Sequence, residues 1–274
     1  MKKNPFLPFV EALEASVEAA RATDMPAPGH RTMPAGTGET AVIFAPHPDD
    51  ECIVGLLPLR LMREAGWRIV VVPVTFGRDP ARRPGRRSEQ DAARAFLGWD
   101  VWAGREGMDP LTSEEFVRSL EDLRPQSIFF PHAGDWNTRH EWTHRMIMEA
   151  LGRMPEGFEC RLFETEFWAP MGDPNRMVEG DAKTVADLVA ATALHRGETV
   201  RNPYHLLLPA WMMDNVRRGA ELVGGQGAAA PDFRFAALYR ESRWTGGRPV
   251  PVEGERMLPV DALKKERRNR KGEG

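Results

Sequence analysis

Short runs of apolar, β-branched residues alternate along this chain with stretches of helical periodicity. The clearest runs are residues 41–45 (AVIFA) and 68–76 (RIVVVPVTF), and a helical stretch follows each of them. Apolar runs of roughly four to eight residues are typical of strands that are buried on both faces of a parallel sheet. The alternation therefore predicts an α/β fold, with a Rossmann-like, mostly parallel sheet flanked by helices.

The same patterns predict the order of elements and the domain organisation. The expected strands are residues 41–45, 68–76, 100–103, 127–131, 161–167 and 233–239. The expected helices are residues 8–22, 50–65, 88–97, 113–123, 140–151, 181–195 and 210–223. Pro and Gly residues over 25–38 indicate a linker, and the basic run near the C-terminus indicates a solvated tail. We therefore expect an N-terminal helix and linker over 1–40, a single domain over 41–250 and a charged tail over 251–274.

Composition limits the classes of function. The chain has 274 residues, of which 42% are hydrophobic and 28% charged, which is ordinary for a folded protein. Its formal net charge is −3, with 37 Lys and Arg against 40 Asp and Glu, so we expect no nucleic-acid partner. No apolar run is long enough to span a bilayer. Two cysteines do not make a disulfide framework, and we expect a cytoplasmic protein.

Charged residues follow the first expected strand directly, in the stretch APHPDDE. His47, Asp49, Asp50 and Glu51 come within six residues of the strand. Buried carboxylates repel one another unless a cation compensates them, and a divalent metal is the simplest such cation. Capping of the following helix accounts for one acidic residue but not for three. The end of a parallel strand is also where ligands bind in such sheets.

A second group of ligand-type residues follows the expected strand at 127–131. The stretch PHAGDWNTRHEWTHR contains His132, Asp135, His140, Glu141 and His144. Two histidines and a carboxylate with an open coordination position form a common hydrolytic metal site. A spare carboxylate beside the ligands, such as Asp49, can take a proton from a metal-bound water. The residues therefore point to metal-dependent hydrolysis.

Several segments resemble one known family. APHPDDE resembles the AHPDDE signature of the PIG-L/LmbE family of metal-dependent N-deacetylases. TFGR, RRSEQDAARAFLGW, DWNTRHEWTHRMIMEAL, LFETEFWAP and ALHRGE resemble later family segments, so the resemblance spans about residues 41–198. The resemblance implies a Rossmann-type α/β fold and removal of an acetyl group from substrates that contain N-acetylglucosamine.

The resemblance also implies residue roles. His47, Asp50 and His140 would bind the metal, with His144 as the second choice for the third ligand, and Asp49 would be the general base. Zn²⁺ is the expected cofactor, although other divalent transition metals suit this set. Arg86 lies where relatives place an arginine that binds substrate.

Two departures from the family pattern bear on the substrate. Asn137 stands where many members have a histidine that helps to stabilise the tetrahedral intermediate, and it would donate a hydrogen bond there. Arg139 replaces the Asp before the ligand histidine, so Asp135 is the expected acceptor for that imidazole. The alternatives to a sugar N-deacetylase are a hydrolase of another small amide and a non-catalytic metal-containing binding protein. The expected partner is a small N-acylated substrate, and a homo-oligomer is possible because relatives often assemble.

Between the second strand and the next helix lies an arginine-rich loop, residues 78–87. Most of its arginines are expected to be solvated. A cluster of them would alternatively bind a phosphate or carboxylate of the substrate.

Overall fold

The structure is a computed structural model, and it describes residues 4–24, 38–105, 107, 109–254 and 256–264. Its strands are β1 (Thr40–Ala45), β2 (Arg68–Pro73), β3 (Asp100–Val101), β4 (Ser127–Pro131), β5 (Cys160–Thr165), β6 (Arg176–Gly180), β7 (Phe235–Thr245), β8 (Arg248–Pro251) and β9 (Met257–Leu258). Its helices are α1 (Leu7–Arg21), α2 (Asp50–Ile53), α3 (Leu56–Arg60), α4 (Arg83–Leu97), α5 (Ser113–Leu123), α6 (Thr138–Gly152), α7 (Ala182–Ala193), α8 (Arg196–Thr199) and α9 (Leu208–Leu222). The described residues also form a π-helical turn, η1 (Leu61–Ala65), and two 3₁₀ turns, η2 (Pro80–Arg82) and η3 (Tyr204–Leu207).

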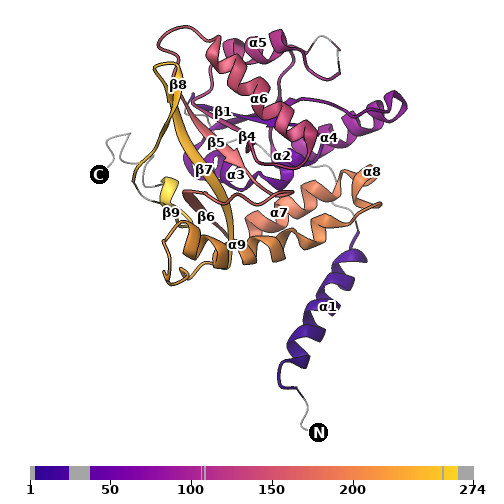
Figure 1. Cartoon of the computed structure of the whole chain (residues 1–274). Helices are drawn as coiled ribbons and strands as arrows, with labels where there is room; N and C mark the ends of the chain where they lie inside the picture. The colour runs from indigo at the N-terminus through magenta and orange to yellow at the C-terminus, as the bar shows by residue number, and fades with distance from the viewer. Residues whose placement is uncertain (1–3, 25–37, 106, 108, 255, 265–274) are drawn as a thin grey trace.

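The strands within these residues form one mixed sheet at the centre of the molecule (Figure 1). Their order is β3-β2-β1-β4-β5-β7-β6-β9, and β8 pairs with β7. The strands from β3 to β5 in this order are all parallel, whereas β7 is antiparallel to its three neighbours β5, β6 and β8. The expected α/β fold with a mostly parallel sheet is confirmed.

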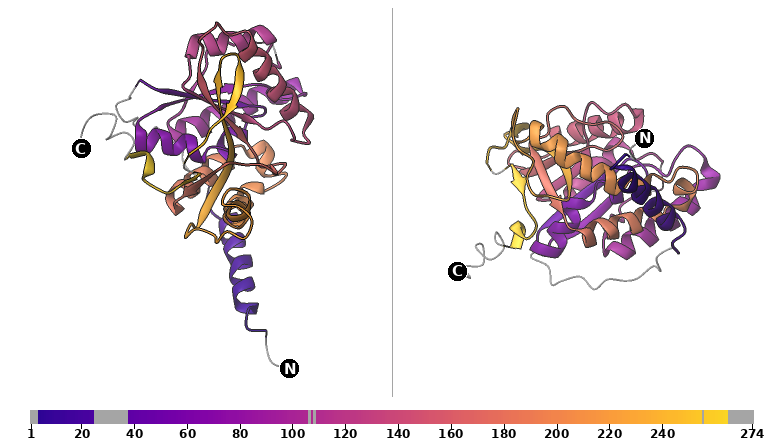
Figure 2. Two further views of the ribbon diagram at one scale, coloured as in Figure 1. Left: turned by 60° about the vertical axis from the view of Figure 1, so that its left-hand side comes forward. Right: turned by 90° about the horizontal axis from the view of Figure 1, so that it is seen from below.

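Alternate residues of the parallel strands face two separate hydrophobic cores. On β1, Ile43 belongs to the core beneath α2, α3, α4 and α7. Its neighbours Val42 and Phe44 belong to the core beneath α5 and α6. All three side chains are essentially inaccessible, because side chains alternate across a strand and helices cover both faces. Two turned views show these helices on either side of the sheet (Figure 2).

The segment after β1 differs from the continuous helix expected over 50–65. It is divided into α2, α3 and the π-helical turn η1. Gly55 separates α2 from α3, and a Cβ atom added there would lie 2.6 Å from the Trp99 ring. Pro58 follows inside α3 and supplies no backbone N–H. The break lets α2 remain a short turn that presents its first residues at the end of β1.

The part of the sheet beyond β5 contains the strands that the sequence did not predict, β6, β8 and β9. They are short: β6 and β8 pair with β7, which runs further than the expected 233–239, whereas β9 pairs in parallel with β6. Beyond residue 250, where the domain was expected to end, β9 pairs with β6, and Leu263 packs into the core. Most of the expected tail, residues 265–274, lies outside the described residues.

Helix α1 projects from the rest of the molecule (Figure 1). None of its residues is buried, and Phe9 and Leu13 on it are well exposed. The linker expected over 25–38 lies outside the described residues except for its last residue. Among the helices that the structure describes, none has the length and apolar character required to cross a membrane.

Arg60 joins α3 to the edge of the sheet. Its buried guanidinium donates to Glu64 Oε1 at 2.6 Å, to the Glu179 carbonyl at 2.8 Å and to the Pro259 carbonyl at 2.6 Å. Removing one partner of a buried pair leaves the other charge uncompensated.

We therefore expect Arg60→Met, which roughly retains side-chain volume, to lower the free energy of unfolding by about 3–5 kcal/mol. Urea denaturation would measure this change. Arg68→Met is the matched control, because Arg68 pairs with Asp100 at 2.6 Å while both side chains are about half exposed, and we expect its cost to be about 0–1 kcal/mol. Equal costs for the two variants would contradict a structural role for Arg60.

Candidate metal and substrate site

The carboxyl ends of β1 and β4 lie next to each other at the point where the strand order reverses. From β1 the chain continues to β2 on one side, and from β4 it continues to β5 on the other. Ligands of open α/β sheets bind in the crevice at such a switch point. His47 follows the end of β1 by two residues, and the loop from β4 to α6 carries Asp135 and Asn137.

Three side chains from these two segments converge. His47 Nδ1 lies 3.3 Å from Asp50 Oδ2, and His140 Nε2 lies 3.2 Å from the same oxygen. One potential ligand atom from each residue lies within 4.8 Å of the other two. Asp50 and His140 are buried, and His47 is partly exposed. The structure thus brings together the three residues for which metal binding was expected.

The tautomer of His140 is set by Asp135. Nδ1 of His140 donates to Asp135 Oδ2 at 3.1 Å, which is the second contact expected for a metal-binding imidazole. Nε2 is then the ring nitrogen that faces Asp50; it is buried and lies 3.2 Å from Asp50 Oδ2, but the two atoms lack the geometry of a hydrogen bond. Asp50 is itself held by the His47 backbone N–H at 2.8 Å and by Trp168 Nε1 at 3.2 Å. A cation among these atoms would satisfy the unpartnered nitrogen, so the residues fit a divalent metal.

The electrostatics of Asp50 and His140 also favour a cation. Burial opposes the charge of Asp50, but His140 and His47 outweigh it and hold the pKa of Asp50 well below its usual range. Burial likewise opposes the charge of His140, but Asp50 and Asp135 raise the pKa of His140 to about 10. Without a metal, the imidazole therefore holds a proton that compensates the carboxylates. A metal that displaces this proton would supply the same positive charge.

Asp49 sits beside this set in an unusual backbone conformation. Its φ is +122°, a value that residues other than glycine rarely adopt. Its backbone N–H donates to Glu51 Oε2 at 3.1 Å, and its carboxylate accepts a short hydrogen bond from the Tyr204 hydroxyl. Burial and Asp50 raise the pKa of Asp49 to about 8, against the opposing effects of His195 and Tyr204. Two adjacent carboxylates therefore have pKa values shifted in opposite directions, which is typical of groups with different acid–base roles.

Behind Asp49 lies a buried group that the sequence did not predict. Glu51 is fully buried and faces His195, whose Nε2 lies 3.5 Å from Glu51 Oε1 and 3.8 Å from Cys52 Sγ. Burial opposes the charge of His195, but Glu51 raises its pKa. His195 belongs to the ALHRGE segment, whose resemblance to the family was recognised but whose place in the fold was not.

The other two histidines of the β4–α6 segment have different partners. His144 Nδ1 donates to the Pro131 carbonyl at 3.0 Å and lies 3.4 Å from Glu164. His132 Nε2 donates to the Ala169 carbonyl at 3.0 Å, and its Nδ1 accepts from the Gly134 N–H at 3.2 Å. Neither belongs to the three-residue set.

Asn137 and Arg86 border the set. Asn137 is the N-cap of α6, and its Oδ1 accepts from the Arg139 N–H at 2.9 Å, so its side-chain orientation is defined. Arg86 donates to the Phe76 carbonyl at 3.3 Å and lies 3.6 Å from Glu198. Gly77, with φ +101°, makes room for it, because an added Cβ atom would lie 2.5 Å from Arg86 Nη1.

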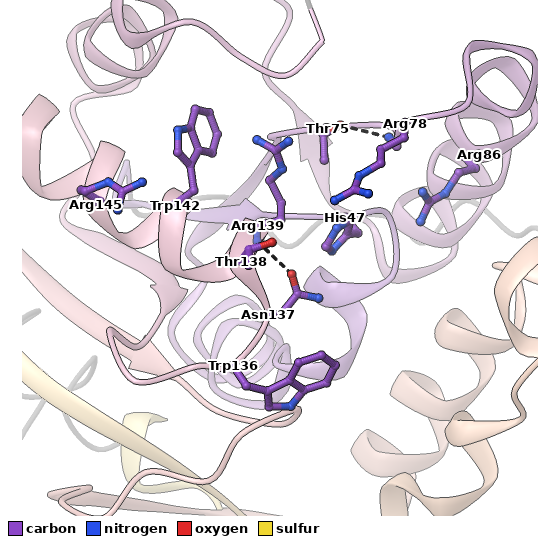
Figure 3. Close-up of a pocket in the computed structure, with 11 residues that line it drawn as sticks. His47, Thr75, Arg78, Arg86, Trp136, Asn137, Thr138, Arg139, Trp142 and Arg145 are labelled. Carbon is purple, nitrogen blue, oxygen red and sulfur yellow. Dashed lines mark hydrogen bonds between the residues drawn. The ribbon is translucent and has the colours of Figure 1, made fainter.

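Two cavities open beside these residues, of about 600 Å³ and about 370 Å³. They share His47, Arg86, Trp136 and Asn137 as lining residues. In the larger one, Arg78 and Arg86 point toward His47 (Figure 3). Asp49, Asp50 and Tyr204 line the smaller one. Tyr204 and Trp168 are therefore site residues that no local sequence pattern indicated.

The raised pKa of Asp49 predicts a pH dependence of stability in the metal-free protein. The unfolded chain releases this proton near the ordinary value of 3.8, whereas the folded protein retains it up to about pH 8. Because the folded state then binds more protons than the unfolded state, the free energy of unfolding falls as pH rises between these values.

Urea unfolding in the presence of a chelator, from about pH 5 to pH 8, would measure this effect in wild type and Asp49→Asn. We expect wild type to lose stability relative to the variant as pH rises, because the amide does not titrate. His140 contributes to both proteins, so its titration largely cancels in the difference. Parallel profiles would show that Asp49 ionises near its ordinary pKa.

Known structures share the fold of this chain at low sequence identity. A conserved protein from Thermus thermophilus aligns with a TM-score of 0.58 and 19% identity, over 78% of this chain and 96% of that chain. The 4-carboxy-2-hydroxymuconate hydratase GalB from Pseudomonas putida gives 0.59 and 18%, over 79% and 99%. The N,N′-diacetylchitobiose deacetylase from Pyrococcus horikoshii gives 0.55 and 15%, over 85% and 92%. At such identities the likeness establishes the fold.

A search of curated proteins finds no match. A comparison with protein families matches residues 42–151 to the family described as PIG-L, GlcNAc-PI de-N-acetylase. These residues run from β1 to α6 and include His47, Asp49, Asp50 and His140. The resemblance expected from the sequence motifs is confirmed over residues 42–151, the segment that carries the candidate metal site.

Proposed function

We propose that this protein is a metal-dependent amide hydrolase that removes the acyl group of a small N-acylated substrate, most simply the acetyl group of an N-acetylglucosamine-type sugar or conjugate. The convergence of His47, Asp50 and His140 beside Asp49 is the observation that carries this proposal. The match of residues 42–151 to a de-N-acetylase family supports the reaction type. The similar fold of a chitobiose deacetylase agrees with it.

In this proposal His47, Asp50 and His140 would hold a divalent metal, which would supply Lewis-acid activation of water and of the acyl carbonyl. Zinc suits two imidazoles and one carboxylate, and it performs hydrolysis without redox chemistry. The proton that His140 carries in the metal-free protein leaves when the imidazole becomes a ligand. Asp135 keeps the ring in the orientation that presents Nε2.

Asp49 is the proposed general base and acid. It takes a proton from the attacking water and returns it to the nitrogen of the leaving amine as the C–N bond breaks. A nearby divalent cation would lower its pKa from the metal-free value of about 8, so that it is ionised when the reaction begins. Tyr204 and Glu51 hold the carboxylate and the backbone of Asp49 in place. The products are a carboxylate and an amine.

Asn137 and Arg86 are proposed to contact the substrate. The Oδ1 atom of Asn137 is engaged by the helix it caps, so the amide Nδ2–H₂ is the group that would donate to the developing oxyanion. Arg86 lines both cavities and would bind a polar group next to the acyl nitrogen. A cytoplasmic location remains part of the proposal and is supported by two buried, unpaired cysteines.

Metal analysis of the purified protein tests the ligand set. We expect near-stoichiometric divalent metal in wild type and in His144→Ala, and loss of the metal in His140→Ala. The His144 variant is the matched control because it lies on the same helix, one turn away, and is partly buried. Circular dichroism would verify that both variants fold. Metal lost only from His144→Ala would make His144 the ligand, and a wild type that binds no metal after reconstitution would overturn the proposal.

Turnover tests the role of Asp49. We expect Asp49→Asn to retain the metal and to lose about 10²–10⁴-fold in kcat, because general-base assistance is removed. Release of acetate and free amine from a panel of N-acetylated amino sugars and simple N-acyl amides would measure the rate. Hydrolysis of the simple amides alone would favour the alternative of another small amide substrate. A folded, metal-loaded wild type that hydrolyses nothing in the panel would favour a binding protein.

A further inference from the structure

The larger cavity beside the candidate site is lined by an unusual excess of positive charge. Arg78, Arg86, Arg139 and Arg145 line it together with His47, and no acidic residue is among the described residues that do so. They come from the loop after β2, from α4 and from α6. In Figure 3, Arg78 and Arg86 lie to the right of Arg139, and Arg145 lies to its left, beyond Trp142. The whole chain has a net charge of −3, so this concentration of arginines is local.

Most of these guanidinium groups have no anionic partner within the protein. In the part of the chain that the structure describes, Arg78, Arg139 and Arg145 make no side-chain hydrogen bond and no ion pair. Arg139 lies over the Trp142 ring at 4.7 Å, which orients it without neutralising it. The carboxylate of Asp109, which acts on Arg139, is already paired with Arg83 at 2.7 Å and Arg105 at 2.9 Å.

Arg139 is half-buried, whereas Arg78 and Arg145 are exposed to solvent. An anion that enters the cavity therefore meets one partly desolvated guanidinium group and two hydrated ones, and all three attract it. Guanidinium groups match carboxylates and phosphates because they donate two parallel hydrogen bonds.

The smaller cavity provides a contrast within the same site. There Arg82, Arg86 and Arg201 surround Glu198, which pairs with Arg82 at 2.9 Å and also with Arg201. Each of these three arginines thus has Glu198 as an anionic partner within the protein. The arginines without such a partner lie in the larger cavity, on one side of His47 and Asn137, which line both cavities.

We propose that the arginine-lined cavity binds an anionic group of the substrate, a carboxylate or a phosphate monoester, through Arg78, Arg139 and Arg145. This inference rests on the proposed function only in taking the acyl group to lie near His47 and Asn137. The anion then occupies the larger cavity and the acyl nitrogen faces the candidate metal site. Trp142 forms an apolar wall on the same side, so the substrate combines a charged end with an uncharged body.

Binding of simple anions tests the cavity without turnover. Isothermal titration of the purified full-length protein with inorganic phosphate and, separately, with succinate would be repeated after treatment with a chelator. Phosphate can ligate a metal directly, so only binding that persists without metal reports on the arginines. We expect saturable, salt-sensitive binding of at least one anion, and the stronger one identifies whether phosphate or carboxylate is preferred.

Arg139→Gln and Arg145→Gln should each weaken that binding by about tenfold, because each removes a charge-assisted hydrogen bond. Arg78→Gln is a third variant in case one of these fails to fold. Arg153→Gln is the matched control, since Arg153 caps the far end of α6, pairs with Glu114 and does not line the cavity. No saturable binding by wild type, or equal affinity in all variants, would overturn the inference.

A paired substrate comparison separates this inference from the proposed function. In the metal-loaded enzyme, N-acetylglucosamine 6-phosphate should have a kcat/KM about tenfold or more above that of N-acetylglucosamine if phosphate is preferred, and Arg139→Gln should remove the difference. An N-acetylated amino sugar that carries a carboxylate would replace the phosphate if succinate binds better. Arginine-dependent anion binding without any hydrolysis would refute the proposed function and leave the anion site intact. Equal hydrolysis of charged and neutral substrates, without anion binding, would refute the anion site and leave the proposed function intact.

Discussion

Three carboxylates in a row, Asp49, Asp50 and Glu51, are buried where β1 turns into α2, and their compensation organises the rest of the site. Each one has a different partner from a different part of the chain. Asp50 faces His140 and His47, Asp49 accepts from Tyr204, and Glu51 faces His195. Because the partners differ, the carboxylates do not have the same proton affinity. Asp50 remains charged, whereas Asp49 has a pKa shifted toward neutrality. Two adjacent carboxylates of one short stretch of sequence therefore differ in their affinity for a proton.

The fold makes this compensation possible by bringing distant segments to one end of the sheet. The switch point between β1 and β4 leaves a space into which α6 delivers His140 and Asn137. The segment after α7 delivers His195 and Tyr204 from the opposite side. The break at Gly55 is part of the same arrangement, since it allows α2 to be a single turn that ends where Trp99 approaches the backbone. The strained φ of Asp49 persists because Glu51 and Tyr204 hold the residue on both its backbone and its carboxylate.

In the proposed function, the two cavities divide chemistry from recognition. The smaller one contains Asp49 and Asp50, and its other charges are internally paired, so it suits proton transfer. The larger one contains the unpaired arginines and suits recognition of charge. Arg139 lines the larger cavity and also stands directly before His140, at a position where the family pattern has an acidic residue. In this structure Asp135 is the acceptor that contacts His140 Nδ1, and Arg139 adds a cation to the cavity wall.

The sequence by itself determined the parallel half of the sheet. Short apolar runs that alternate with stretches of helical periodicity are visible in the local sequence, and they predict buried strands connected by helices. It also indicated the residues of the β1–α2 turn and the register that favours His140 over His144, since these lie in contiguous motifs. It did not reveal β6, β8 and β9, which are short: β6 and β8 are paired with β7, and β9 is paired with β6. Nor did it reveal the roles of Tyr204, Trp168 and His195, or that the arginines of two segments share one cavity. Those features depend on contacts between residues far apart in the chain, and local propensity carries no information about such contacts. Only the tertiary structure decided them.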